Sequence, residues 1–196
     1  MPGSRTMKTL GALVAAMTAG SIALILMEAP PIRPPVTNLS AVAAPTDEFS
    51  QVVSQTDEPI RIAKWRHIVV HTAAEPLDVD FDCHFVIDPS PRADGGILRA
   101  TTLWNRQVSG NHVFAGGYNW NDDSIAVVVM GDFSKAPPNT KQMQALVGLV
   151  RSLQRACGVP AEKVYLARDI DPRSGSPGAA FPTAQFNVSL LRPGRP

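Results

Sequence analysis

From about residue 66 onwards, apolar residues fall into short runs separated by polar loops, which is typical of a sheet built from short strands. The run at 124–131, Ser-Ile-Ala-Val-Val-Val-Met-Gly, is nearly unbroken and suits a strand that is covered on both faces, as in α/β layers. Asp-Pro, Ser-Gly and Pro-Gly pairs predict a loop over 168–178. The predicted strands cover 66–71, 83–88, 124–131 and 163–166, with a weaker one at 96–100.

The clearest helix is predicted over 140–157, where apolar residues recur every three or four positions. Asn139 is placed to cap its first turn, and Gln142 three residues later completes a capping box. Gly158 and Pro160 end the helix. The apolar stripe consists of Met143, Leu146, Val147, Val150, Leu153 and Cys157.

An apolar and small-residue run at 10–27 follows the basic residues Arg5 and Lys8. At ~1.5 Å per residue, such a helix is roughly 27 Å long, close to the thickness of a bilayer core. We therefore interpret residues 1–28 as a membrane anchor, or alternatively as a signal segment cleaved in the small-residue stretch 41–45. Positive charge before the run predicts that the rest of the chain is exported.

Prolines and small residues dominate 29–58, which predicts an extended linker. The folded domain is expected at 59–191, followed by a tail at 192–196. The pattern of strands and helix predicts the α/β class, with a mixed sheet flanked by helices.

Of the 196 residues, 44% are hydrophobic and 18% are charged, which provides a core and excludes a disordered chain. The net charge of +1 gives no basic footprint, so nucleic acid is not an expected partner. Two cysteines, Cys83 and Cys157, allow one disulfide in an exported protein or two buried free thiols.

Taken in order, many short motifs between 59 and 191 resemble the zinc amidase family of N-acetylmuramoyl-L-alanine amidases and peptidoglycan recognition proteins. The resemblance implies a mixed sheet flanked by helices and a groove for cell-wall peptide or glycan. Its motifs are Trp65 to Ala73, His84 to Asp88, Asp94-Gly95, Trp104, Gln107, Gly110, His112, Asn121, Ser124-Ile125, Gly131-Asp132-Phe133, Gln142, Ala145-Leu146, Arg168-Asp169, Pro177-Gly178 and Phe181-Pro182.

The resemblance also implies a zinc site with three protein ligands, where the metal activates a water molecule. His71, at the end of the first strand, matches the first ligand. The second ligand position, before Arg168-Asp169, holds Ala167, and the third, before Pro177-Gly178, holds Ser176. A methyl group cannot bind zinc and a neutral hydroxyl binds it poorly, so we interpret His71 as vestigial, with no catalytic residue and no bound cofactor expected.

Two further departures from the family pattern affect the groove. Cys83 stands where the family often has a tyrosine that stabilises charge on the reacting carbonyl, and a thiol is a weak donor. The segment 72–83 is too short for the helix that usually forms one groove wall.

Several other side chains are candidates for the site. A substitute metal site of His71, His84 and His112 is conceivable, although alternation along a strand should point His84 away from Cys83. Candidate ligand-binding residues are Cys83, His112, Trp120, Asn121 and Ser124, and the aromatic side chains of Trp104, Phe114 and Tyr118 could also stack on a ligand or pack in the core.

Three functions remain open at this point. The first is an exported, non-catalytic domain that binds peptidoglycan or muropeptides, held at the membrane by its N-terminal segment or secreted. The second is an active amidase that hydrolyses the muramoyl–L-alanine bond with unrecognised ligands. The third is a structural domain that has lost ligand binding and contacts a protein partner.

Overall fold

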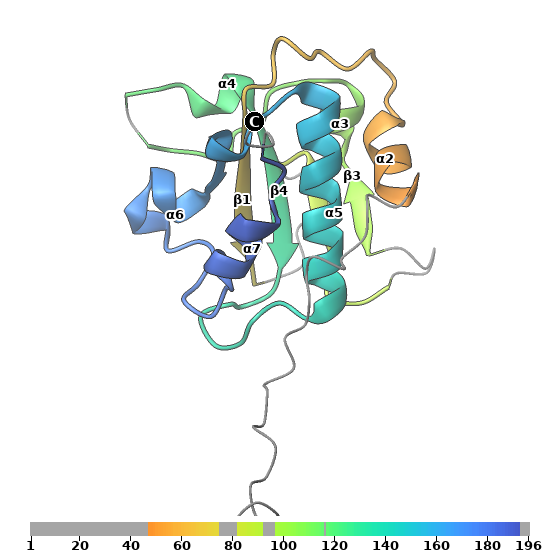
Figure 1. The fold of residues 1–196 in the computed structure, drawn as a ribbon. Coiled ribbons are helices and arrows are strands. Elements are labelled where there is room, and N and C mark those ends of the chain that lie inside the picture. The colour runs from red at the N-terminus through yellow and green to blue at the C-terminus, as the bar shows by residue number, and fades with distance from the viewer. Residues whose placement is uncertain (1–46, 75–81, 92–96, 116, 193–196) are drawn as a thin grey trace, which may run out of the picture. The chain divides into compact units, whose positions relative to one another are not determined.

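The computed structural model describes residues 47–74, 82–91, 97–115 and 117–192. Five strands form one sheet in the order β3-β2-β4-β1-β5, and only β3 runs antiparallel to its neighbour (Figure 1). This mixed sheet confirms the predicted fold class. Its strands are β1 (His67–Ala73), β2 (Phe85–Ile87), β3 (Leu98–Ala100), β4 (Ser124–Met130) and β5 (Val164–Leu166).

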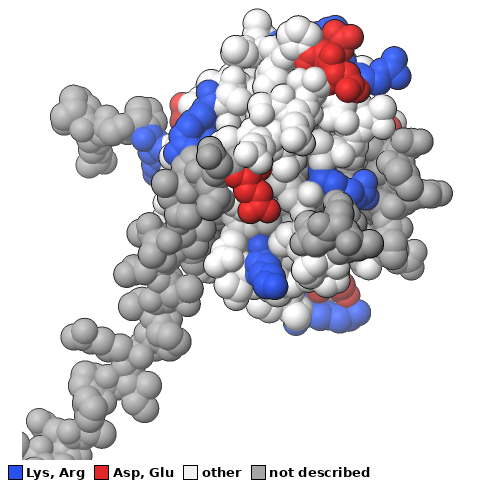
Figure 2. Space-filling model, turned by 90° about the vertical axis from the view of Figure 1, so that its right-hand side faces the viewer, with Lys and Arg blue, Asp and Glu red and all other residues white. Residues whose placement is uncertain are grey.

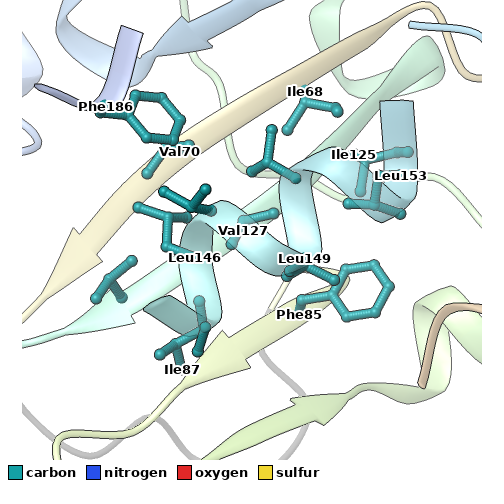
Figure 3. Packing of buried hydrophobic residues seen from close by; sticks show 14 of the residues in the cluster. Ile68, Val70, Phe85, Ile87, Ile125, Val127, Leu146, Leu149, Leu153 and Phe186 are labelled. Atoms are coloured by element: carbon teal, nitrogen blue, oxygen red, sulfur yellow. The ribbon is translucent and has the colours of Figure 1, made fainter. Parts of the chain in front are cut away.

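Strand β4 lies between β1 and β2 and is buried at all seven positions, as its unbroken apolar run predicts. Helix α5 (Thr140–Cys157) packs across one face of the sheet (Figure 1). Leu146, Leu149 and Leu153 meet alternate residues of β1 and β4 there, such as Ile68 and Val127 (Figure 3). These residues form the main hydrophobic core.

The ends of α5 follow their sequence signals. The Asn139 side chain accepts a hydrogen bond from the Gln142 backbone N–H, and the Gln142 side chain accepts one from the Asn139 N–H. At the other end, Gly158 has φ 70°, a left-handed conformation that glycine adopts without strain. The capping box and the predicted helix bounds are confirmed.

Residues 47–54 are helical, which corrects the predicted linker. Helix α2 (Asp47–Ser54) packs against α5, and its Val53 is 2% exposed. The Trp104 indole N–H donates to the Val53 carbonyl at 3.0 Å. The folded domain therefore begins before the predicted boundary at residue 59, because Phe49, Val52 and Val53 give this segment an apolar face.

The predicted loop at 168–178 contains two short helical elements, which is a second correction. The remaining elements are α3 (Thr102–Asn105), α4 (Trp120–Asp123), η2 (Ala161–Lys163), α6 (Ala167–Ile170), η3 (Pro172–Ser174) and α7 (Thr183–Ser189). Proline and glycine limit α6 and η3 to single turns but do not prevent them.

The two cysteines are free thiols on opposite sides of the sheet. Cys157 belongs to the core under α5, whereas Cys83 packs on the other face with Val86 and Ala126. Burial raises the pKa of each thiol to about 12. The sheet between them excludes the disulfide alternative in this fold.

Several predictions fall on residues that are not described, among them the membrane anchor or signal segment at 1–28, most of the linker at 29–58 and nearly all of the tail at 192–196. No helix within the described ranges is both long and apolar enough to cross a membrane. The prediction that the segment 72–83 lacks a groove-wall helix also falls mainly on residues that are not described. On the face drawn in Figure 2, acidic and basic side chains are scattered and form no single basic patch.

Candidate functional site

Strand β1 presents His67, Val69 and His71 on the sheet face opposite α5, because side chains alternate along a strand. His71 lies toward the carboxyl end of β1, where the resemblance places a metal ligand. Its Nε2 lies 3.0 Å from Nδ1 of His112, and the two rings meet edge to face. The structure therefore pairs His71 with another imidazole from a loop 41 residues away.

The protons in this pair can be assigned from the neighbouring groups. The Ser124 hydroxyl donates to the Trp120 carbonyl, so it can only accept from Nε2–H of His112, at 3.3 Å. Nδ1 of a neutral His112 is then an acceptor, and His71 must donate to it from Nε2. Ser124 and His112 thus fix the tautomer of His71.

Burial keeps both rings neutral. Desolvation, and then the nearby His112, lower the pKa of His71 to about 3. Desolvation also lowers the pKa of His112 to about 4, although a hydrogen bond to the Ser124 backbone partly opposes it. Two neutral imidazoles can share one N–H···N hydrogen bond without charge repulsion.

Asn121 holds the loop that carries His112. Its Oδ1 accepts from the backbone N–H groups of His112 and Val113, each at 2.9 Å, and its Nδ2 donates to the Val113 carbonyl at 2.8 Å. These three bonds place His112 over the end of β1. The sequence indicates Asn121 as a ligand-binding candidate, and in the structure it positions this loop.

Ala167 and Ser176 also lie around the end of β1. Ala167 is 4% exposed and packs against Val69 and Val113 in an apolar cluster. The Ser176 hydroxyl accepts from the Thr72 backbone N–H at 2.8 Å, next to His71. The two positions that the resemblance assigns to the other metal ligands therefore contact β1 residues on either side of His71 in the sequence.

These residues do not fit a zinc ion. One imidazole nitrogen is engaged with His112, the methyl group of Ala167 carries no lone pair, and the Ser176 hydroxyl is bonded to the backbone. Across the described residues, no group of three or more His, Cys, Asp or Glu side chains could hold a metal ion.

His84 cannot complete a substitute site. Its Nδ1 accepts from the Ala126 N–H at 2.9 Å and its Nε2 donates to the Val108 carbonyl at 3.0 Å, so both nitrogens are used. The ring is fully buried beside Trp65 and Trp104, and desolvation lowers its pKa to about 3. Trp104 is likewise a core residue, 0% exposed.

Three further candidates, Cys83, Phe114 and Trp120, differ in how far they are exposed and in what they contact. Cys83 is 1% exposed and its thiol is packed among apolar side chains. Phe114 is 74% exposed. Trp120 lies beside the rings of His67 and Tyr165, with centroids at 5.0 and 5.3 Å, and so faces the amino end of β1 as well as the Val69 cluster.

At that amino end lies a pocket of about 700 Å³, which we call the aromatic pocket. Its position was not predicted, although two signals exist in the sequence: His67 shares the alternate positions of His71, and Tyr165 lies on a predicted strand. The residues that line it include Arg66, His67, Tyr118, Trp120, Lys163 and Tyr165.

Comparisons with known proteins agree with this architecture. The N-acetylmuramoyl-L-alanine amidase LysCS from Clostridium intestinale URNW is 16% identical with a TM-score of 0.54, covering 69% of this chain and 91% of its own. The amidase AmiD from E. coli, solved with anhydro-N-acetylmuramic acid-L-Ala-D-gamma-Glu-L-Lys, is 22% identical with a TM-score of 0.55, covering 66% and 59%. A selenomethionine derivative of AmpD is 18% identical with a TM-score of 0.53, covering 69% and 87%.

No curated protein matches the chain. The family described as N-acetylmuramoyl-L-alanine amidase matches residues 61–179, which is more than half of the sequence. The order of sequence motifs and the mixed sheet point to the same family. The chain therefore belongs to the N-acetylmuramoyl-L-alanine amidase family.

Proposed function

We propose that this chain is an exported, non-catalytic amidase-fold domain that binds peptidoglycan fragments. The observation that carries the proposal is what occupies the three ligand positions. His71 is hydrogen-bonded to His112, Ala167 lies in an apolar cluster, and the Ser176 hydroxyl accepts a hydrogen bond from the Thr72 backbone. Without a metal to lower the pKa of water, the site lacks the nucleophile that amide hydrolysis at neutral pH requires.

Binding without catalysis is supported by what the fold retains. The loop that carries His112 is held in place by Asn121 over the end of β1. A relative with this fold, AmiD, was solved with a muropeptide substrate. Export is supported by the apolar run at 10–27 after Arg5 and Lys8, which would either anchor the domain outside the cytoplasm or release it there.

The proposal is tested by mixing the purified chain with insoluble peptidoglycan, with and without added zinc. We expect the chain to sediment with the wall while releasing no stem peptides. Asn121→Ala should weaken retention by roughly fivefold or more, because three hydrogen bonds that order the loop are lost. Asn187→Ala, an exposed position on α7, is the matched control and should leave retention unchanged.

Two results would contradict this function. Release of stem peptides that a chelator abolishes would show an active amidase. Absence of retention on peptidoglycan, with a folded chain, would favour a domain that contacts a protein partner instead.

A further inference from the structure

The aromatic pocket lies on the same sheet face as His71 but at the opposite end of β1. His67 and His71 are four residues apart along the strand, which corresponds to about 13 Å. Val69, packed against Ala167 and Trp120, lies between them. The pocket is therefore separate from the vestigial metal position and has its own side chains.

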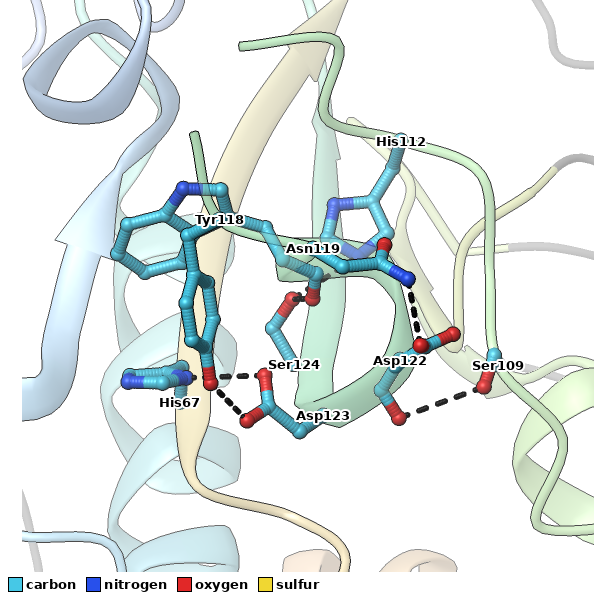
Figure 4. Close-up of polar contacts among 9 residues, drawn as sticks. His67, Ser109, His112, Tyr118, Asn119, Asp122, Asp123 and Ser124 are labelled. Atoms are coloured by element: carbon cyan, nitrogen blue, oxygen red, sulfur yellow. Dashed lines mark hydrogen bonds and ion pairs between the residues drawn. The ribbon is translucent and has the colours of Figure 1, made fainter. Parts of the chain in front are cut away.

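Two residues that line the pocket, His67 and Tyr118, share a hydrogen-bond partner behind them. Asp123 accepts from Nδ1 of His67 at 3.2 Å and from the Tyr118 hydroxyl, so both carboxylate oxygens have donors (Figure 4). Nδ1 and Nε2 lie on different sides of an imidazole ring, and Nε2 of His67 makes no hydrogen bond to the described residues. Nε2 is thus the ring nitrogen left for a ligand hydroxyl, which can donate or accept.

Aromatic rings form the apolar part of the pocket. Tyr118 and Trp120 meet at a centroid distance of 5.1 Å, and Tyr165 meets Trp120 at 5.3 Å, each edge to face. Tyr118 is 45% exposed, so part of its ring remains free for contact. Such a surface suits the apolar face of a ring-shaped ligand.

The charged side chains that line the pocket are basic. Arg66 and Lys163 line it and are exposed, and none of the described residues that line it is acidic. Asp123 lies behind His67, where it accepts from His67 and Tyr118, and its hydrogen bond and charge, with the charge of Asp122, raise the pKa of Tyr118. Arg66 lies close enough to pull the pKa of Tyr118 down against the stronger raising effect of the hydrogen bond to Asp123. An anionic ligand fits this arrangement.

We infer that the aromatic pocket binds a pyranose that carries a free carboxylate, with the sugar ring against Tyr118, Trp120 and Tyr165 and the carboxylate near Arg66 and Lys163. This inference rests on the proposed peptidoglycan function. Within that polymer, the muramoyl carboxyl forms the amide bond to L-alanine and therefore carries no charge. Hydrolysis of the amide leaves the carboxylate on the sugar and the amine on the peptide, so the pocket would select glycan whose stem peptides have been removed.

The test is titration of the full chain with N-acetylmuramic acid, followed by calorimetry or tryptophan fluorescence. We expect N-acetylglucosamine, which lacks the carboxylate, and benzoate, which lacks the sugar, to bind at least about tenfold more weakly. Arg66→Glu and Lys163→Glu should each weaken N-acetylmuramic acid by about tenfold or more. Lys141→Glu, an exposed position on α5, is the matched control and should have no effect.

Equal affinity for the two sugars, tighter binding of benzoate, or unchanged affinity in both pocket variants would overturn the inference. A second arm compares insoluble glycan before and after an active amidase has stripped its peptides, with the stripped glycan expected to bind more tightly. Binding of N-acetylmuramic acid and of stripped glycan, without retention on intact peptidoglycan, would contradict only the proposed function. Retention on intact peptidoglycan without binding of N-acetylmuramic acid would contradict only this inference.

Discussion

His84 and His112 each accept a hydrogen bond at one ring nitrogen, which requires a neutral ring, and burial keeps His71 neutral as well. His84 uses one nitrogen as an acceptor and the other as a donor. Because Nδ1 of His112 is an acceptor, the proton of His71 must lie on Nε2. The place of His71 at the end of a strand follows from the sequence pattern. Its bond to His112 does not, because nothing in the spacing of two residues 41 positions apart specifies their contact.

These neutral rings predict that the free energy of unfolding decreases as the pH is lowered. The unfolded chain takes up protons near the ordinary histidine pKa of 6.5, whereas the folded pKa of His71 and of His84 is about 3 and that of His112 about 4. Below 6.5 the unfolded state binds more protons, so the free energy of unfolding decreases as the pH falls toward the folded values. The limiting loss is about 1.4 kcal/mol per pH unit for each histidine.

Urea unfolding at about pH 7.5 and about pH 5 measures this loss. His112→Asn removes one of the three groups and should make the dependence shallower. A free energy of unfolding that is the same at both pH values would contradict the assignment of three neutral buried rings.

At the level of elements, periodicity and capping residues predict β1, β4 and α5 well because those elements are long or strongly apolar. Helix α2 was missed although Phe49, Val52 and Val53 carry a helical period, since the proline-rich composition before it favours an extended linker. The single turns of α6 and η3 were missed because their order comes from neighbours: Arg168 donates from its backbone N–H to the Ser176 carbonyl at 2.6 Å.

The contact between α2 and α5 gives a prediction at this scale. A Cβ added at Gly148 would overlap the Phe49 ring. Gly148→Ala should therefore lower the free energy of unfolding by about 1–3 kcal/mol, despite the better helix propensity of alanine.

The control is the same substitution in a Phe49→Ala background, where the overlap is gone. There Gly148→Ala should be neutral or stabilising by up to about 1 kcal/mol. Equal destabilisation in both backgrounds, measured by urea unfolding, would show that α2 does not pack on α5 as described.

For the whole molecule, the pattern of strands and helix predicts the class of the fold, and the order of the motifs indicates the family. It does not predict which distant groups meet. The Ser176 hydroxyl reaches the backbone of Thr72 across 104 residues, and the aromatic pocket is assembled from three separate segments. Such contacts depend on how loops fold over the sheet, which local patterns do not specify.

Zinc content after equilibration with excess zinc and desalting tests the central claim most directly. The comparison is a chain with Ala167→His, Ser176→Cys and His112→Ala, which restores two ligands and frees His71. We predict far less than one zinc per wild-type chain and about one per chain of the variant, because three protein ligands suffice for a zinc site. Firmly held, stoichiometric zinc in the wild-type protein would contradict the account, and a folded variant without zinc would show that the three positions do not converge.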